Sequence, residues 1–65
     1  MDWMTTAEVA SALGVTEGTL YRWRKDGVGP KWHRIGRGVK YRAITIKLYI
    51  AEAEEGKIED LASVA

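Results

Sequence analysis

TTAEVASALGVTEGTLYRWRKDG, residues 5–27, predicts two short helices joined by a tight turn. Thr5 with Glu8 three residues later is the pattern of a capping box, so the first helix is expected to begin there and to run to about Leu13. Gly14 can then adopt the left-handed conformation that ends a helix. The face expected to pack inward carries Ala7, Ala10 and Leu13.

The second helix is expected to begin after the cap Thr16 and to end near Asp26. Leu20 and Trp23 lie three residues apart, so they share a face and should pack inward. Gly18 lies in the first turn, where the missing side chain would let a DNA backbone or a base edge come close. The same helix carries the cations Arg22, Arg24 and Lys25. Two closely joined helices, one of them basic, suit insertion into the major groove of DNA.

From residue 31 onward the pattern alternates with a period of two, which predicts strands at 31–35 and 39–42. The turn between them is expected to have three residues, Gly36-Arg37-Gly38. One face of this hairpin should cover the helices, with His33, Ile35, Val39 and Tyr41. The other face should be exposed and basic, with Trp32, Arg34, Lys40 and Arg42.

Thr45 is expected to cap a third helix at about 46–55, closed by Gly56. Its apolar face carries Ile46, Tyr49, Ile50 and Ala53. Residues 57–65 are a short tail that forms a last helical turn, binds a partner or is disordered. The predicted fold is mainly α with a small β-hairpin, a winged helix-turn-helix. We expect one such domain over 1–56, followed by the tail.

Charge is strongly segregated along these 65 residues, although the formal net charge is only +1. Residues 21–47 hold nine Lys or Arg and one acid, a net charge of +8, and the remainder holds eight acids and one Lys, a net charge of −7. The alternative is ordinary solvated surface, but the cations coincide with the expected docking helix. A basic face of this kind favours a polyanionic partner.

Other classes of function find little support. The chain has no cysteine and a single histidine, His33, which is expected to be packed and hydrogen-bonded rather than to bind a metal. The carboxylates of 52–60 lack an apolar pocket, and no nucleophile and base occur at a suggestive spacing. We therefore expect no enzyme activity, no cofactor and no metal. The longest uncharged runs are too short to cross a membrane, and a cytoplasmic protein is expected.

Several short motifs occur together over residues 3–53. They are Met4-Thr5-Thr6-Ala7-Glu8-Val9-Ala10, Leu13-Gly14-Val15-Thr16, Thr19-Leu20-Tyr21-Arg22-Trp23-Arg24, Gly27, Gly29-Pro30, Ile35-Gly36 and Tyr41-Arg42. With them the chain resembles the small winged-helix proteins of the excisionase and MerR-like superfamily, whose members include prophage regulators and terminase DNA-binding subunits. It departs from the family at Gly18, where a polar side chain is common, and at Ala43-Ile44-Thr45, where the family commonly has an acidic cap.

The resemblance implies that Thr19, Tyr21 and Arg22 face the major groove and that Arg37 reaches the minor groove from the wing. It also implies an excisionase, or recombination directionality factor, which binds direct repeats cooperatively, bends DNA and directs an integrase toward prophage excision. The alternatives are a small prophage transcriptional regulator and, from another class, a protein-interaction adaptor. The expected partners are double-stranded DNA, neighbouring copies in a head-to-tail array and a phage integrase.

The residues themselves leave several roles open. Arg22 can read guanine with its fork or contact a phosphate. Thr19 can touch a phosphate or a thymine methyl, or only fill its helix face, and Tyr21 can bond a phosphate or pack on the hairpin. Arg37 enters the minor groove or is only an exposed turn residue. The expected DNA-backbone contacts are Thr16, Gly18, Arg24, Lys25, Lys40 and Arg42. Trp3 should cover the first helix, and Trp32 packs on the wing base or meets another protomer.

Overall fold

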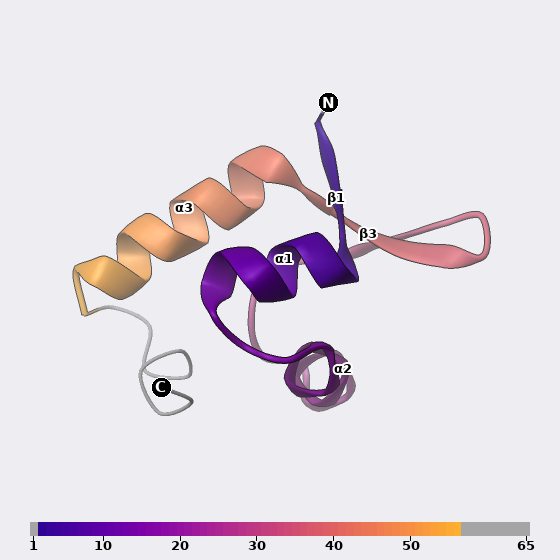
Figure 1. Cartoon of the computed structure of the whole chain (residues 1–65), viewed down its shortest axis with the longest axis horizontal. Helices are drawn as coiled ribbons and strands as arrows, with labels where there is room; N and C mark the ends of the chain where they lie inside the picture. The colour runs from indigo at the N-terminus through magenta and orange to yellow at the C-terminus, as the bar shows by residue number, and fades with distance from the viewer. Residues whose placement is uncertain (1, 57–65) are drawn as a thin grey trace.

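The computed structural model describes residues 2–56 of the chain, so Met1 and the expected tail at 57–65 lie outside the described residues. Its elements, in order, are β1 (Trp3–Thr5), α1 (Thr6–Leu13), α2 (Glu17–Asp26), β2 (His33–Ile35), β3 (Gly38–Arg42) and α3 (Ala43–Glu54). α1 contacts α2, β1 and β3, and α3 packs against β3 (Figure 1). The predicted winged helix-turn-helix is confirmed, with β1 as an additional strand.

Helix-forming signals at the N-terminus act as the sequence predicts. The Thr5 amide donates to Glu8 Oε1 at 2.8 Å, and the Glu8 amide donates to Thr5 Oγ1 at 3.1 Å, which completes the capping box. Gly14 ends α1 with φ 74° and Gly27 ends α2 with φ 74°, the left-handed conformation that favours glycine. Thr16 caps α2 by accepting a hydrogen bond from the Thr19 amide at 3.1 Å.

A short strand that the sequence analysis did not identify completes the sheet. β1 pairs antiparallel with β3 and places Trp3 opposite Arg42 and Met4 opposite Tyr41. The sheet order is β1-β3-β2, so β3 is the central strand. The expectation that Trp3 covers the first helix is wrong, because the Trp3 ring lies beside the His33 ring and the Arg42 guanidinium, on the face of the sheet that points away from the helices.

The hairpin turn has two residues instead of the expected three. Ile35 pairs with Gly38, so only Gly36 and Arg37 lie between the strands, and Gly36 has φ 61°. A positive φ at the first of two turn residues is the pattern of a type II′ turn, which suits tight hairpins. One residue fewer in the turn moves every side chain of β2 to the opposite face.

The predicted faces of β2 are consequently wrong, while those of β3 are right. Opposed residues of an antiparallel pair point to the same face, so His33 lies with Lys40 and Arg34 lies with Val39. The outer face of the sheet therefore carries His33, and the face toward the helices carries Arg34.

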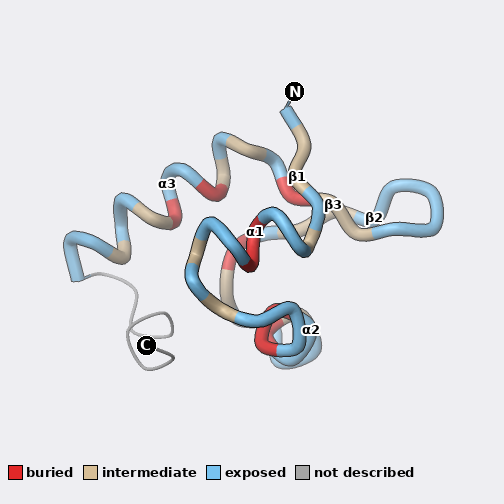
Figure 2. Tube along the Cα trace, viewed as in Figure 1, coloured by how far each residue is buried: buried red, intermediate tan, exposed pale blue. Residues whose placement is uncertain are grey.

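The core lies where α1, α2, β3 and α3 meet. Its buried members are Val9, Ala10, Leu20, Trp23, Tyr41, Ile46 and Tyr49. Buried residues are red in Figure 2, and most of the other described residues are exposed. Ala7 is exposed, which corrects the predicted inward face of α1, where Val9 takes its place.

α3 begins earlier than predicted. Its first residue is Ala43, Arg42 occupies the N-cap position without a side-chain hydrogen bond, and Thr45 already lies within the first turn. The predicted Thr45 cap is therefore wrong. The first amide of the helix, that of Ala43, instead donates to the carbonyl oxygen of Asp2, the residue before β1, at 2.7 Å.

Candidate nucleic-acid interface

The solvent-facing side of α2 is basic. Leu20 and Trp23 point into the core, whereas Arg22 and Lys25 are exposed and Tyr21 is 57% exposed. The helix spacing that buries the first two side chains necessarily turns the others outward. α2 thus presents an uncovered basic surface of the kind that enters a major groove.

Thr19 does not belong to that surface. Its side chain is 5% exposed, and its hydroxyl hydrogen-bonds the Thr16 hydroxyl at 3.0 Å. Arg22 Nη2 donates to Thr19 Oγ1 at 3.3 Å. Thr19 is therefore buried and bonded to Arg22, and its predicted major-groove contact stays a prediction.

Arg24 and Lys25 gather around the Tyr21 ring. The Arg24 guanidinium carbon lies 5.9 Å and the Lys25 Nζ 5.7 Å from the ring centroid. Arg24 Nη1 also donates to the Tyr41 hydroxyl at 2.9 Å, which ties the last turns of α2 to β3. Arg24 is therefore half-buried and held in place, and its other guanidinium nitrogens are not bonded to a described residue.

Gly18 is exposed on the first turn of α2. A Cβ at this position would meet only Thr16 Oγ1, at 3.8 Å, so the fold itself does not require glycine there. The Thr16 hydroxyl is engaged by its own helix cap. DNA-backbone contacts by these two residues remain predictions.

The wing projects beyond the helices and carries Arg37 at its tip (Figure 1). Arg37 is exposed and flanked by glycines on both sides, so no neighbouring side chain obstructs its guanidinium. Its position fits the expected minor-groove contact, which stays a prediction.

Lys40 and Arg42 lie on the outer face of the sheet, away from α2. There the Arg42 guanidinium carbon lies 5.2 Å from the centroid of the Trp3 ring, and the Trp3 and His33 rings meet edge to face at 5.4 Å. The expectation that His33 faces inward is wrong, for the register reason given above. The predicted backbone contacts of α2 and those of β3 thus belong to two separate surfaces.

The structure brings two further residues to the α2 surface that the sequence analysis placed elsewhere. Trp32 packs against the core, and the Arg34 guanidinium carbon lies 5.9 Å from its ring centroid. A notch of about 250 Å³ is lined by Tyr21, Arg24, Lys25, Trp32 and Arg34. The glycine at the first position of a two-residue turn was the signal that could have placed Arg34 here.

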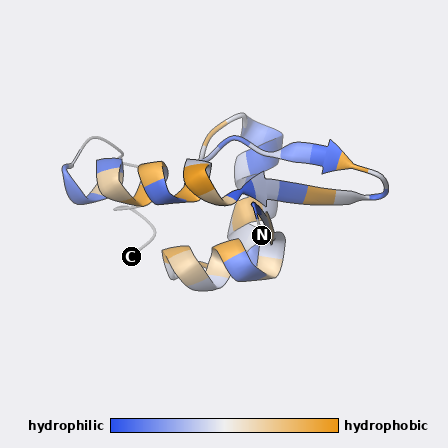
Figure 3. Ribbon diagram, turned by 90° about the horizontal axis from the view of Figure 1, so that it is seen from above, coloured by the Kyte–Doolittle hydropathy of each residue, from blue (hydrophilic) through white to orange (hydrophobic). Residues whose placement is uncertain are grey.

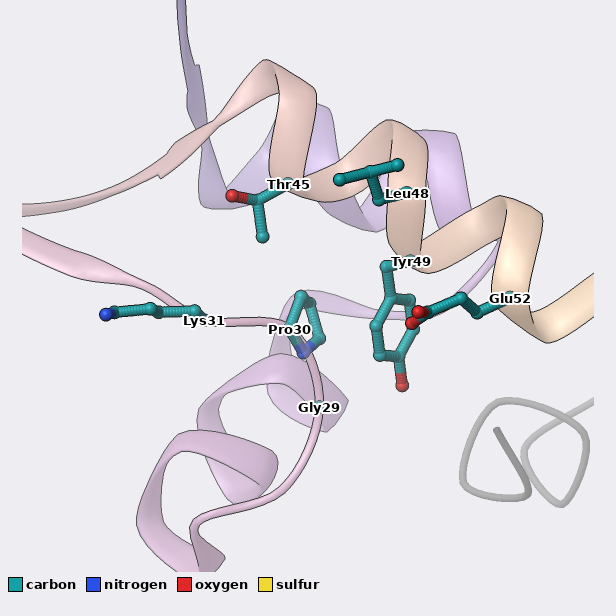
Figure 4. Close-up of a pocket in the computed structure, with 7 residues that line it drawn as sticks. All are labelled: Gly29, Pro30, Lys31, Thr45, Leu48, Tyr49 and Glu52. Carbon is teal, nitrogen blue, oxygen red and sulfur yellow. The ribbon is translucent and has the colours of Figure 1, made fainter. Parts of the chain in front are cut away.

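A second hollow, of about 400 Å³, lies between the loop at 29–31 and α3 (Figure 4). Pro30, Leu48 and Tyr49 form its apolar wall, and Glu52 lies at one end. Over residues 2–56 no three His, Cys, Asp or Glu side chains gather in a way that could hold a metal ion. The lining contains no pair of groups arranged as nucleophile and base.

A comparison with protein-family models matches residues 3–54 to the family described as helix-turn-helix domain. No curated protein and no solved structure matches the chain significantly. Within the described residues, no helix is long and apolar enough to cross a lipid bilayer.

Proposed function

Because the chain belongs to the helix-turn-helix domain family, a family of DNA-binding modules, we propose that it is a DNA-bending protein of the excisionase type. In this proposal it acts on DNA in the cytoplasm of a bacterial host, together with a phage integrase, and it is not itself an enzyme. The observation that carries the proposal is the combination of α2, whose basic side is exposed to solvent, with a projecting hairpin. Two such elements suit the simultaneous occupation of adjacent grooves.

Arg22 is the residue that we assign to base reading. Its guanidinium is exposed but restrained by Thr19. Less conformational freedom is therefore lost when the guanidinium N–H groups form two hydrogen bonds to a guanine in the major groove. Tyr21 stands beside it on the exposed side. Arg37, on the wing, would enter the narrow minor groove next to the major groove that α2 occupies, where the negative potential is strongest.

One copy makes few base contacts, so specific action requires several copies on neighbouring sites. The carboxyl end of α3, with Glu52 and Glu54 exposed, lies at the opposite end of the molecule from the hairpin tip (Figure 3). An acidic end and a basic end on one molecule suit a head-to-tail, open-ended array along DNA. The domain at 1–56 would carry both ends of this contact.

Bending and footprinting assays on DNA that spans a prophage attachment site test the proposal. Laddered complexes, protection of direct repeats and strong bending support an excisionase. A single promoter footprint without bending would indicate a transcriptional regulator instead. An adaptor would show no competition by DNA of any defined sequence. With about five phosphates neutralised, log K should fall with a slope of about −4 to −5 against log salt.

Cooperativity is tested separately by comparing DNA that has one site with DNA that has several. The double variant Glu52→Gln, Glu54→Gln should keep the single-site affinity and lose the extra affinity on repeated sites. Asp2→Asn serves as the control, since Asp2 is another exposed acid but lies outside α3. Equal per-site affinity of the wild-type protein on both DNAs would refute the array.

A further inference from the structure

The geometry points to a seat for one backbone phosphate of DNA in the notch between α2 and β2, in which Arg34 joins Arg24 and Lys25. This inference rests on the proposed DNA binding and adds a specific contact to it. The seat includes neither Arg22, the proposed base-reading residue, nor Arg37 at the wing tip. Arg34 is the residue whose substitution tests it.

The three cations of the notch have no anionic partner within residues 2–56. None of them forms an ion pair with a described residue, and no carboxylate lines the notch. Three like charges held around one hollow repel one another, and an anion placed between them offsets that repulsion by its attraction to each cation. The notch is therefore complementary to a negatively charged group.

The cations are also held in place before any ligand arrives. Arg24 is tied to the Tyr41 hydroxyl at 2.9 Å and lies over the Tyr21 ring, and Arg34 lies over the Trp32 ring. An aromatic ring beneath a guanidinium restrains it, while the N–H groups stay free to donate in the plane of the guanidinium itself. Such restrained guanidinium groups match the oxygens of a phosphate with two hydrogen bonds each.

The same stacking argues for a phosphate rather than a base. Arg24 and Lys25 lie over the Tyr21 ring, and Arg34 lies over the Trp32 ring, so a base that stacks on the covered face of either ring must displace a cation. A phosphate in contrast needs only the outward N–H groups. The position also suits the DNA backbone, because the strand that borders a major groove passes the side of the helix inserted into it.

Arg34 thus connects the reading helix to the wing. A phosphate held jointly by α2 and β2 fixes how far α2 enters the groove and how the hairpin approaches the next groove. The contact carries no sequence information of its own. Its loss should weaken binding to all sequences alike, in contrast to the loss of Arg22.

A scan with methylphosphonate DNA, combined with Arg34→Gln, tests the seat. The DNA is a duplex that wild-type protein selects from a randomised pool, with one phosphate at a time replaced by a neutral methylphosphonate. Among the several positions where the replacement weakens wild-type binding, we expect one that depends on Arg34, with a loss of about tenfold or more, as the loss of charge-assisted hydrogen bonds predicts. At that position Arg34→Gln should lose little further affinity, and Arg34→Lys should recover part of the dependence.

Lys47→Gln is the matched control, because it removes one exposed cation from α3 and should leave the whole scan unchanged. Circular dichroism confirms that each variant is folded. Identical scans for Arg34→Gln and wild-type protein would overturn the seat and leave the proposed DNA binding intact. Competition by free nucleoside monophosphate that depends on Arg34 would overturn it in favour of a nucleotide pocket. Failure of wild-type protein to select any DNA would instead overturn the proposed function itself.

Discussion

Gly29 lies against the ring of Trp23, and its replacement by alanine should destabilise the fold strongly. The backbone at Gly29 has φ 82°, and a Cβ built there would come within 2.6 Å of Trp23 Cε3 and 3.2 Å of Trp23 Cβ. The ring cannot move aside freely, because Trp23 is 8% exposed and packs beside Tyr49 in the core. Both the backbone conformation and the space therefore exclude a side chain.

The two contributions can be given separate magnitudes. A non-glycine residue in the left-handed region costs about 1–2 kcal/mol, less a gain of about 0.4–1 kcal/mol from the stiffer unfolded chain. Overpacking against a core ring costs a further 1–3 kcal/mol, roughly. A chain of this size is stable by only about 3–10 kcal/mol, so Gly29→Ala should remove a large share of its stability.

Urea denaturation followed by circular dichroism measures the effect, with Gly27→Ala as the matched control. Gly27 has φ 74° and nothing within 4 Å of its Cβ position, so alanine there meets the backbone strain without the clash. We expect Gly29→Ala to be less stable than Gly27→Ala by about 1–3 kcal/mol. In thermal unfolding, each kcal/mol of that difference should lower Tm by roughly 4–8 °C. Equal destabilisation by the two variants would refute the contact between Gly29 and Trp23.

Three further predictions concern the side of α2 that is proposed to bind DNA. Gly18→Ala should stabilise the helix by up to about 1 kcal/mol in thermal unfolding and weaken DNA binding; unchanged affinity would exclude close DNA approach at Gly18. Thr19→Val should cost about 0.5–1.5 kcal/mol in urea denaturation and relax sequence preference in a binding selection, because Arg22 loses its bond; an unchanged preference would show that Arg22 needs no such restraint. Tyr41→Phe should cost a similar amount, again about 0.5–1.5 kcal/mol, and lower affinity equally for all sequences by freeing Arg24; a selective loss would contradict that role.

The sequence predicts the helical half of the molecule well because its signals are local. The cap at Thr5 and the terminal glycines act on neighbouring residues, and the inward face of α2 follows from helix spacing alone. The start of α3 is different, since its first amide, that of Ala43, donates to the carbonyl oxygen of Asp2, far away in the chain. A pairing between such distant residues leaves no local pattern to recognise.

The candidate site is harder to predict, because it depends on strand register. A turn of two residues rather than three exchanges the two faces of β2, so that His33 lies on the outer face and Arg34 lies toward α2. Trp3 joins the sheet through pairing with Arg42, a contact that no motif near Trp3 indicates. The exposed cations of α2 were predictable from its period, whereas the notch that they form with β2 was not.

An NMR titration of ¹⁵N-labelled protein with its selected DNA duplex tests the central claim most directly. If α2 enters the major groove and the hairpin reaches the adjacent minor groove, the largest amide shifts will lie in α2 around Gly18 and Arg22 and at the hairpin tip around Arg37. The carboxyl half of α3 will shift little on DNA with a single site. Shifts that are confined to α3, or to the outer face of the sheet around His33, would contradict the account.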